Sequence, residues 1–166
     1  MQHKLLTMSR TALLALLAVV ALSACKKEEA PKAQAAAVAV PTNGDPNAWQ
    51  AYASDVVKKN MDGVNSAPFV YFLPEESDPN FQDQYDAQAE KVKSDLTRGI
   101  LEGNMLAFVS PASAKMGDLV IASFADVAAG SMKGVKVLFI GQAADNERVK
   151  AAVAPSGVNY VFVEAK

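Results

Sequence analysis

The sequence of residues 45–166 predicts an α/β fold built on a parallel sheet. Four short apolar segments rich in β-forming residues alternate with longer segments whose apolar residues recur at helical spacing. This alternation is typical of parallel sheets, in which crossover helices connect successive strands. We therefore expect four parallel strands in the order 2-1-3-4, a small doubly wound sheet of the flavodoxin-like or Rossmann-like type with an additional N-terminal helix.

The helices are located by their start signals. Asp45 before Pro46, and Asp78 before Pro79, each place a capping residue ahead of a proline at the first helical position. Trp49 lies on the apolar face of the first helix, so we expect it in the core and not at a ligand. Helices are expected over residues 46–62, 79–102, 111–129 and 143–154. Strands are expected over residues 69–73, 105–109, 135–140 and 158–163.

The expected strand order also predicts how the helices are distributed over the sheet. Right-handed crossovers would place the helix at 79–102 on one face and the two later helices on the other. The helix at 46–62 would then cover the rest of the first face.

The first 24 residues have the composition of a secretory signal. Lys4 and Arg10 supply the positive charge, and residues 11–22 form an uninterrupted apolar run. This run has 12 residues, whereas a helix needs about 20 to cross a bilayer core. We therefore expect a removable signal peptide and not a permanent membrane span.

The only cysteine of the chain follows this run directly, in Leu22-Ser23-Ala24-Cys25. This motif resembles the lipobox of bacterial lipoproteins, in which an aliphatic residue and two small residues precede the cysteine. The resemblance implies cleavage between Ala24 and Cys25 and acylation of Cys25 by diacylglycerol and fatty acids such as palmitate. The next residue is Lys26, and the absence of aspartate there implies the outer membrane, facing the periplasm. The alternative is an ordinary secretory signal followed by an unrelated cysteine.

Residues 25–44 are expected to tether the domain to the membrane. This stretch is rich in alanine and charge, contains two prolines and has no aromatic residue. It therefore offers too little apolar surface to offset the entropy of ordering. A short helix through residues 33–40 is the alternative. The chain thus divides into a signal at 1–24, a tether at 25–44 and one domain at 45–166.

Composition excludes several classes of function. His3 is the only histidine and would leave with the signal, and Cys25 would be lipidated. Catalytic triads, zinc sites of the Cys/His type, CxxC redox chemistry and disulfides are therefore excluded. Loss of the signal leaves 14 basic and 18 acidic residues, and no basic patch interleaves with aromatic residues, which argues against binding to nucleic acid.

Candidate site residues follow the predicted strands. With the order 2-1-3-4, the loops after the first and third strands meet at the carboxyl edge of the sheet. Their oxygen ligands could bind Mg²⁺, Ca²⁺ or a small ligand, although helix capping and solvation explain the same residues. These candidates are Glu75, Glu76, Asp78, Gln142 and Asp145.

The loop after the second strand contributes a second set of candidates. Ser110, Ser113 and Lys115 could receive an anion at a helix N-terminus, and capping is again the simpler explanation of both serines. No glycine-rich phosphate-binding pattern follows any strand, so we expect no nucleotide and no other cofactor.

These features favour a non-catalytic binding or scaffolding domain held in the cell envelope. Its partner would be another envelope protein or a cell-wall component. The alternative is a small-ligand receptor or a metal-dependent enzyme that uses the acidic loops. An α/β enzyme that has retained only its fold is a third possibility.

Overall fold

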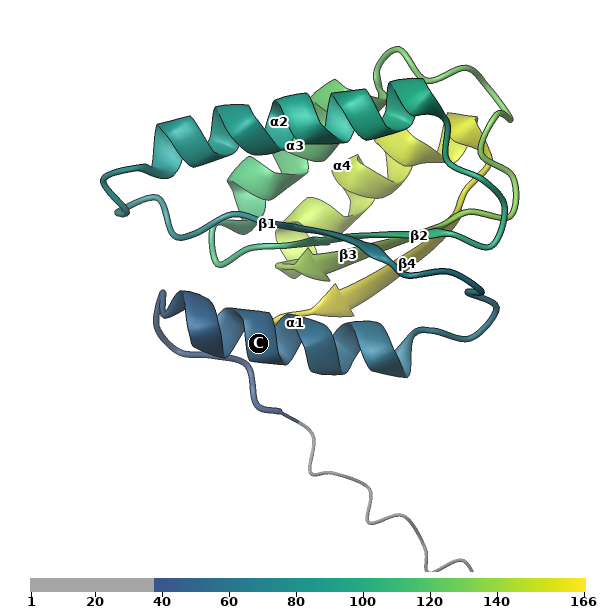
Figure 1. Ribbon diagram of the computed structural model, residues 1–166. Coiled ribbons are helices and arrows are strands. Elements are labelled where there is room, and N and C mark those ends of the chain that lie inside the picture. Colours follow the sequence, from purple (N-terminus) through teal and green to yellow (C-terminus); the bar gives the residue numbers. More distant parts are fainter. Residues whose placement is uncertain (1–37) are drawn as a thin grey trace, which may run out of the picture. The chain divides into compact units, whose positions relative to one another are not determined.

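The computed structural model describes residues 38–166 (Figure 1). Along the chain the elements are α1 (Pro46–Lys59), β1 (Phe69–Phe72), α2 (Phe81–Arg98), β2 (Met105–Val109), α3 (Ser113–Phe124), β3 (Lys136–Gly141), α4 (Ala143–Val153), a short 3₁₀ turn (Ala154–Ser156) and β4 (Asn159–Glu164). Of the helices in this part of the chain, none is both long and apolar enough to cross a membrane. The signal, Cys25 and most of the expected tether lie outside the described residues.

The four strands form one parallel sheet, which confirms the α/β class. The strand order is β1-β2-β3-β4, so the predicted order 2-1-3-4 is wrong. Each right-handed crossover moves the chain one position in the same direction, and this places α2, α3 and α4 on the same face (Figure 1). We predicted that the helix at 79–102 would lie on one face and the two later helices on the other, and this prediction is therefore also wrong.

Among the helices of residues 38–166, only α1 covers the opposite face (Figure 1). In a doubly wound sheet the chain reverses direction so that crossover helices cover both faces. Here α1 comes before the first strand and supplies the second layer without any reversal. This explains how a sheet with sequential strand order buries both of its faces.

The core consists of two apolar layers separated by the sheet. Between the sheet and α2–α4, Tyr71 stacks on Phe108 with 5.0 Å between ring centroids. Beneath α1, Trp49 and its helix neighbours pack mainly on β2 and β3. Trp49 is 5% exposed, which confirms the prediction that it belongs to the core.

All four helices are shorter than predicted, and α2 and α3 differ most from their predicted bounds. The carboxylate of Asp78 accepts a hydrogen bond from the Asn80 N–H at 2.8 Å, which closes a turn so that α2 begins at Phe81. The same helix ends at Arg98, because Gly99 adopts a left-handed φ of 91°. Helix α3 likewise begins after the Ser110-Pro111 turn and ends at Phe124, five residues before the predicted end.

Residues 38–44 contact the domain. The Val38 N–H donates to the Asp55 carboxylate of α1 at 3.3 Å, and Val40 packs on the apolar layer beneath α1. The last residues of the expected tether, 38–44, are therefore part of the domain.

Candidate functional site

The strand order prevents the predicted acidic site from assembling. Strand β2 lies between β1 and β3, so the loop with Glu75, Glu76 and Asp78 does not adjoin the loop after β3. Glu75 and Glu76 are exposed, and Asp78 closes the turn before α2. Within residues 38–166, no three acidic, histidine or cysteine side chains are placed to hold a metal ion.

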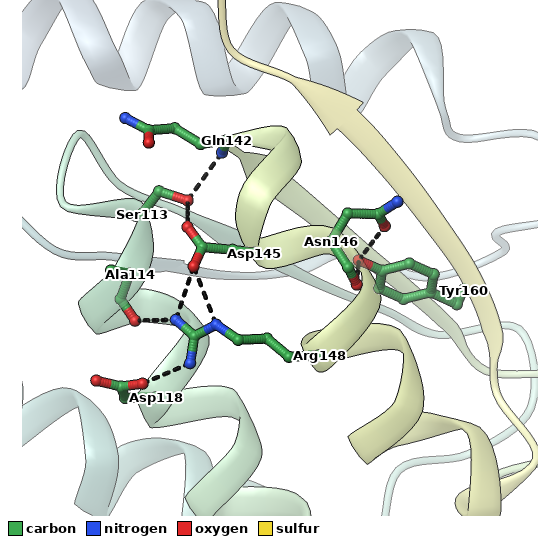
Figure 2. Close-up of polar contacts among 8 residues, drawn as sticks. All are labelled: Ser113, Ala114, Asp118, Gln142, Asp145, Asn146, Arg148 and Tyr160. Atoms are coloured by element: carbon green, nitrogen blue, oxygen red, sulfur yellow. Dashed lines mark hydrogen bonds and ion pairs between the residues drawn. The ribbon is translucent and has the colours of Figure 1, made fainter.

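The structure instead brings together Ser113, Gln142 and Asp145, which the sequence assigned to two separate sites (Figure 2). These residues stand at the starts of α3 and α4, where neighbouring strands β2 and β3 end. The Ser113 hydroxyl donates to the Asp145 carboxylate at 2.5 Å and accepts from the Gln142 N–H at 2.8 Å. Ser113 and Asp145 are both buried.

Arg148 completes this cluster and was not predicted. Its guanidinium donates to Asp145 at 2.8 and 3.0 Å, to Asp118 at 2.5 Å and to the Ala114 carbonyl at 2.6 Å (Figure 2). Hydrogen bonding to Asp118, and then to Asp145, raises the pKa of Arg148 above its ordinary value. The i,i+3 spacing of Asp145 and Arg148 was visible in the sequence, but their contact with α3 depended on the strand order.

The cluster therefore locks α3 to α4. The hydroxyl of Ser113 has both a donor and an acceptor partner, and the Asp145 carboxylate is held by Ser113 and Arg148 together. These bonds join the first turns of α3 and α4, and we therefore assign the cluster a structural role.

The remaining two members of the predicted anion set are also placed. Ser110 is buried; its hydroxyl accepts from the Ala112 N–H at 2.8 Å and donates to the Pro74 carbonyl at 3.4 Å. These bonds fix the turn that leads into α3. Lys115 is half-buried in the first turn of α3 and makes no hydrogen bond or ion pair within the described part of the chain.

A hollow of about 320 Å³ lies at the carboxyl ends of β2 and β3. Trp49, Ser110, Ser113 and Gln142 line it, together with residues 40–42 and 165–166. Several of its polar wall groups are already bonded within the chain: the Trp49 Nε1–H donates to the Asn43 carbonyl at 2.8 Å, and both serines are paired as described. The hollow therefore presents few free groups that could orient a small ligand.

A larger groove, of about 570 Å³, runs between α1 and β1. It exists because α1 packs mainly on β2 and β3 and leaves the adjacent face of β1 uncovered. Val70 of β1 is 45% exposed there. The lining is mostly apolar and consists of Ala53, Val57, Met61, Pro68, Val70, Phe72 and Val109, with Gln50, Ser54 and Lys58 as its polar members.

This groove was not found from the sequence. Val70 and Phe72 belong to an apolar run that reads as a fully buried strand, and nothing local indicates that one face would be left open. Comparisons with protein-family models, curated proteins and solved structures find no match to this chain. Since α/β sheets support many unrelated activities, function has to be inferred from the surfaces of this molecule.

Proposed function

We propose that this chain is a lipid-anchored protein of the bacterial cell envelope with a non-catalytic α/β binding domain. The motif Leu22-Ser23-Ala24-Cys25 supports an acylated Cys25, and Lys26 supports the outer membrane with the domain facing the periplasm. Two or three acyl chains on one residue give stable anchoring, whereas one chain binds only marginally.

The binding surface that we propose is the groove between α1 and β1. This is the observation that carries the proposal, because apolar side chains gather there at the surface while the polar side chains at the strand ends satisfy one another. Val70, which is exposed, and Phe72, which is half-buried, form its floor. Apolar surface of this kind is typical of protein–protein contacts.

The partner that fits best is an amphipathic helix of another envelope protein. A second helix lying beside α1 would complete the half-covered layer and bury Val70 and Phe72 against its apolar face. The ammonium group of Lys58 at the groove favours an acidic residue on the polar side of that helix. A cell-wall glycan fits less well, since the groove offers few groups for its hydroxyls.

The groove is tested by placing a photoreactive amino acid at Val70 of the full chain, expressed in cells. The matched control position is Leu101, which is also a large exposed hydrophobic residue, 74% exposed, and lies outside the groove. We expect an adduct with one envelope protein at position 70 and none at position 101.

The identified protein is then titrated against purified variants of the full chain. Val70→Lys should weaken its binding at least tenfold, and Leu101→Lys should leave it unchanged. Adducts with lipid alone at position 70, or equal binding by both lysine variants, would contradict the proposed partner.

The anchor is tested separately with labelled palmitate. The chain should incorporate label and sediment with membranes, and Cys25→Ser should abolish both. Continued labelling of Cys25→Ser would show that another residue is acylated and would contradict the proposed anchor.

A further inference from the structure

Strand β4 is an open edge of the sheet. It lies at the end of the strand order opposite β1, and within residues 38–166 no strand pairs with its outer side. The Asn159 N–H donates to Val135 at 2.8 Å and the Ala165 N–H donates to Gly141 at 2.9 Å. In a parallel ladder alternate residues bond to one neighbour. The N–H and C=O groups of Tyr160, Phe162 and Glu164 therefore point outward.

This edge has few of the features that usually prevent strands from pairing with other molecules, and Glu164 is the one charged residue of β4. Strand β1 is only four residues long and lies between Pro68 and Pro74, which keeps that edge short. Strand β4 is six residues long, pairs with β3 in unbroken register and contains no proline, glycine or lysine. Its side chains stay partly exposed, whereas those of β3 are buried from Val137 to Gly141.

We propose that β4 pairs antiparallel with β4 of a second copy of this chain, with Phe162 of each copy opposite the other. In this register Tyr160 of one copy lies opposite Glu164 of the second copy. All the outward N–H and C=O groups of these three residues are then paired, and the two sheets join into one continuous sheet. The two-fold axis stands perpendicular to the sheet.

The side chains of β4 fit a copy of themselves on both faces. On the face of α1, Val161 of one copy lies opposite Val163 of the other, a β-branched pair of the kind that stabilises antiparallel strands. On the other face the two Phe162 rings adjoin, each already stacked on Phe139 at 6.3 Å between centroids. No like charges are placed directly opposite each other in this register.

The dimer also suits a chain tethered at its N-terminal side. An axis perpendicular to the sheet keeps both α1 helices on the same side, and Val38 of each copy is bonded to α1 on that side. The groove beside β1 lies at the far edge of each sheet and stays open. The dimer thus does not depend on the proposed binding function, and either can fail without the other.

The register is tested by disulfide formation in membranes that contain the full chain. In antiparallel pairs, hydrogen-bonded residues lie about 5.5 Å apart between Cα atoms, within disulfide range. Phe162→Cys should therefore crosslink into a dimer on oxidation. Val161→Cys should not, because diagonal neighbours lie about 7–8 Å apart. The unmodified chain, with Cys25 alone, measures the background.

Pairing itself is tested with two substitutions of Glu164. Both Glu164→Pro and Glu164→Ala remove the Lys166–Glu164 ion pair, but only proline removes the outward N–H and obstructs the edge. Sedimentation of the detergent-solubilised chain should show that Glu164→Pro weakens the dimer at least tenfold and that Glu164→Ala does not. These variants keep Phe162, so they remain informative if Phe162→Cys fails to fold. Three results would each overturn the proposal: a monomeric native chain, a Glu164→Pro dimer as stable as the native one, or crosslinking of Val161→Cys in place of Phe162→Cys.

Discussion

Asp95 of α2 provides the sharpest test of how this fold is stabilised. Its side chain is almost fully buried against β1, where it accepts a hydrogen bond from the Tyr71 hydroxyl at 2.8 Å and another from Lys91 at 2.8 Å. Arg98 pairs with its second oxygen. Tyr71 is completely buried, whereas Lys91 and Arg98 are largely exposed. If Asp95 is removed, water can hydrate Lys91 and Arg98 but not the buried hydroxyl of Tyr71.

Asp95→Ala leaves the Tyr71 hydroxyl buried without a partner. Loss of a hydrogen bond to a charged group, with a buried donor left unpaired, is worth about 1.5–3 kcal/mol. The exposed ion pairs with Lys91 and Arg98 add less than about 1 kcal/mol each. We therefore expect Asp95→Ala to lower the free energy of unfolding by about 3 kcal/mol, or roughly 10 °C in Tm. Tyr71→Phe removes only the hydroxyl and should cost about 1 kcal/mol.

The same cluster predicts a dependence on pH. Burial by itself would raise the pKa of Asp95, but the hydrogen bonds from Lys91 and Tyr71 outweigh burial and hold its pKa below the ordinary value. A pKa lower in the folded than in the unfolded chain stabilises the fold above about pH 4, and this stabilisation is lost as the pH falls through the folded pKa. The stability difference between the native chain and Asp95→Asn should therefore narrow below about pH 4.

The assay is urea unfolding at pH 7 of the native chain, Asp95→Ala, Tyr71→Phe and the double variant. The pH dependence is measured by urea unfolding of the native chain and Asp95→Asn from pH 7 down to pH 3. A double-mutant cycle should give a coupling of at least about 1 kcal/mol between Tyr71 and Asp95. Lys91→Ala serves as the exposed control and should cost less than about 1 kcal/mol. A cost below 1 kcal/mol for Asp95→Ala, or a difference for Asp95→Asn that does not change with pH, would refute this reasoning.

Two further predictions concern the hollow at the strand ends. Trp49→Phe keeps an aromatic ring in the layer beneath α1 but loses the hydrogen bond to the Asn43 carbonyl. We expect it to lower the free energy of unfolding, measured by thermal unfolding, by about 1–2 kcal/mol. Trp49→Ala also empties part of the core and should lower it by about 3–5 kcal/mol. Gly141→Ala would place its Cβ 2.5 Å from the Ser113 hydroxyl oxygen, so the Ser113–Asp145 lock should open, with a loss of stability of about 1–3 kcal/mol. Ser113→Ala in the Gly141→Ala background should then recover part of that loss; no recovery would show that the methyl group acts elsewhere.

Much of this fold could be predicted because its signals are local. The apolar run at 105–109 coincides with β2, and Asp45-Pro46 gives the start of α1, where the Asp45 carboxylate accepts from the Asn47 N–H. The error in α2 has the same local basis. Asp78 does accept a backbone N–H, but the bond closes a turn ahead of the helix, and the sequence does not distinguish these two uses of one aspartate.

The strand order could not be predicted, because the local sequence does not determine on which side of a strand the following strand pairs. Each connection is right-handed in either order, and β1, β2 and β3 are all apolar enough to be central. The candidate site depended on that choice. Because β3 pairs with β2, Asp145 contacts Ser113 and not Asp78. The cluster with Arg148 depends on the same pairing.

The strand order also determines where a binding surface can lie. Doubly wound sheets place a crevice where the chain reverses direction, and ligands bind there. A sheet ordered β1-β2-β3-β4 has no reversal, so its strand-end loops pack side by side and the polar groups of Ser113 and Asp145 satisfy each other. Helix α1, the one described helix on the second face, packs mainly on β2 and β3, and the surface it leaves uncovered is at β1. The sequential order therefore accounts both for the pairing of Ser113 with Asp145 at the strand ends and for the open groove on which the proposed function rests.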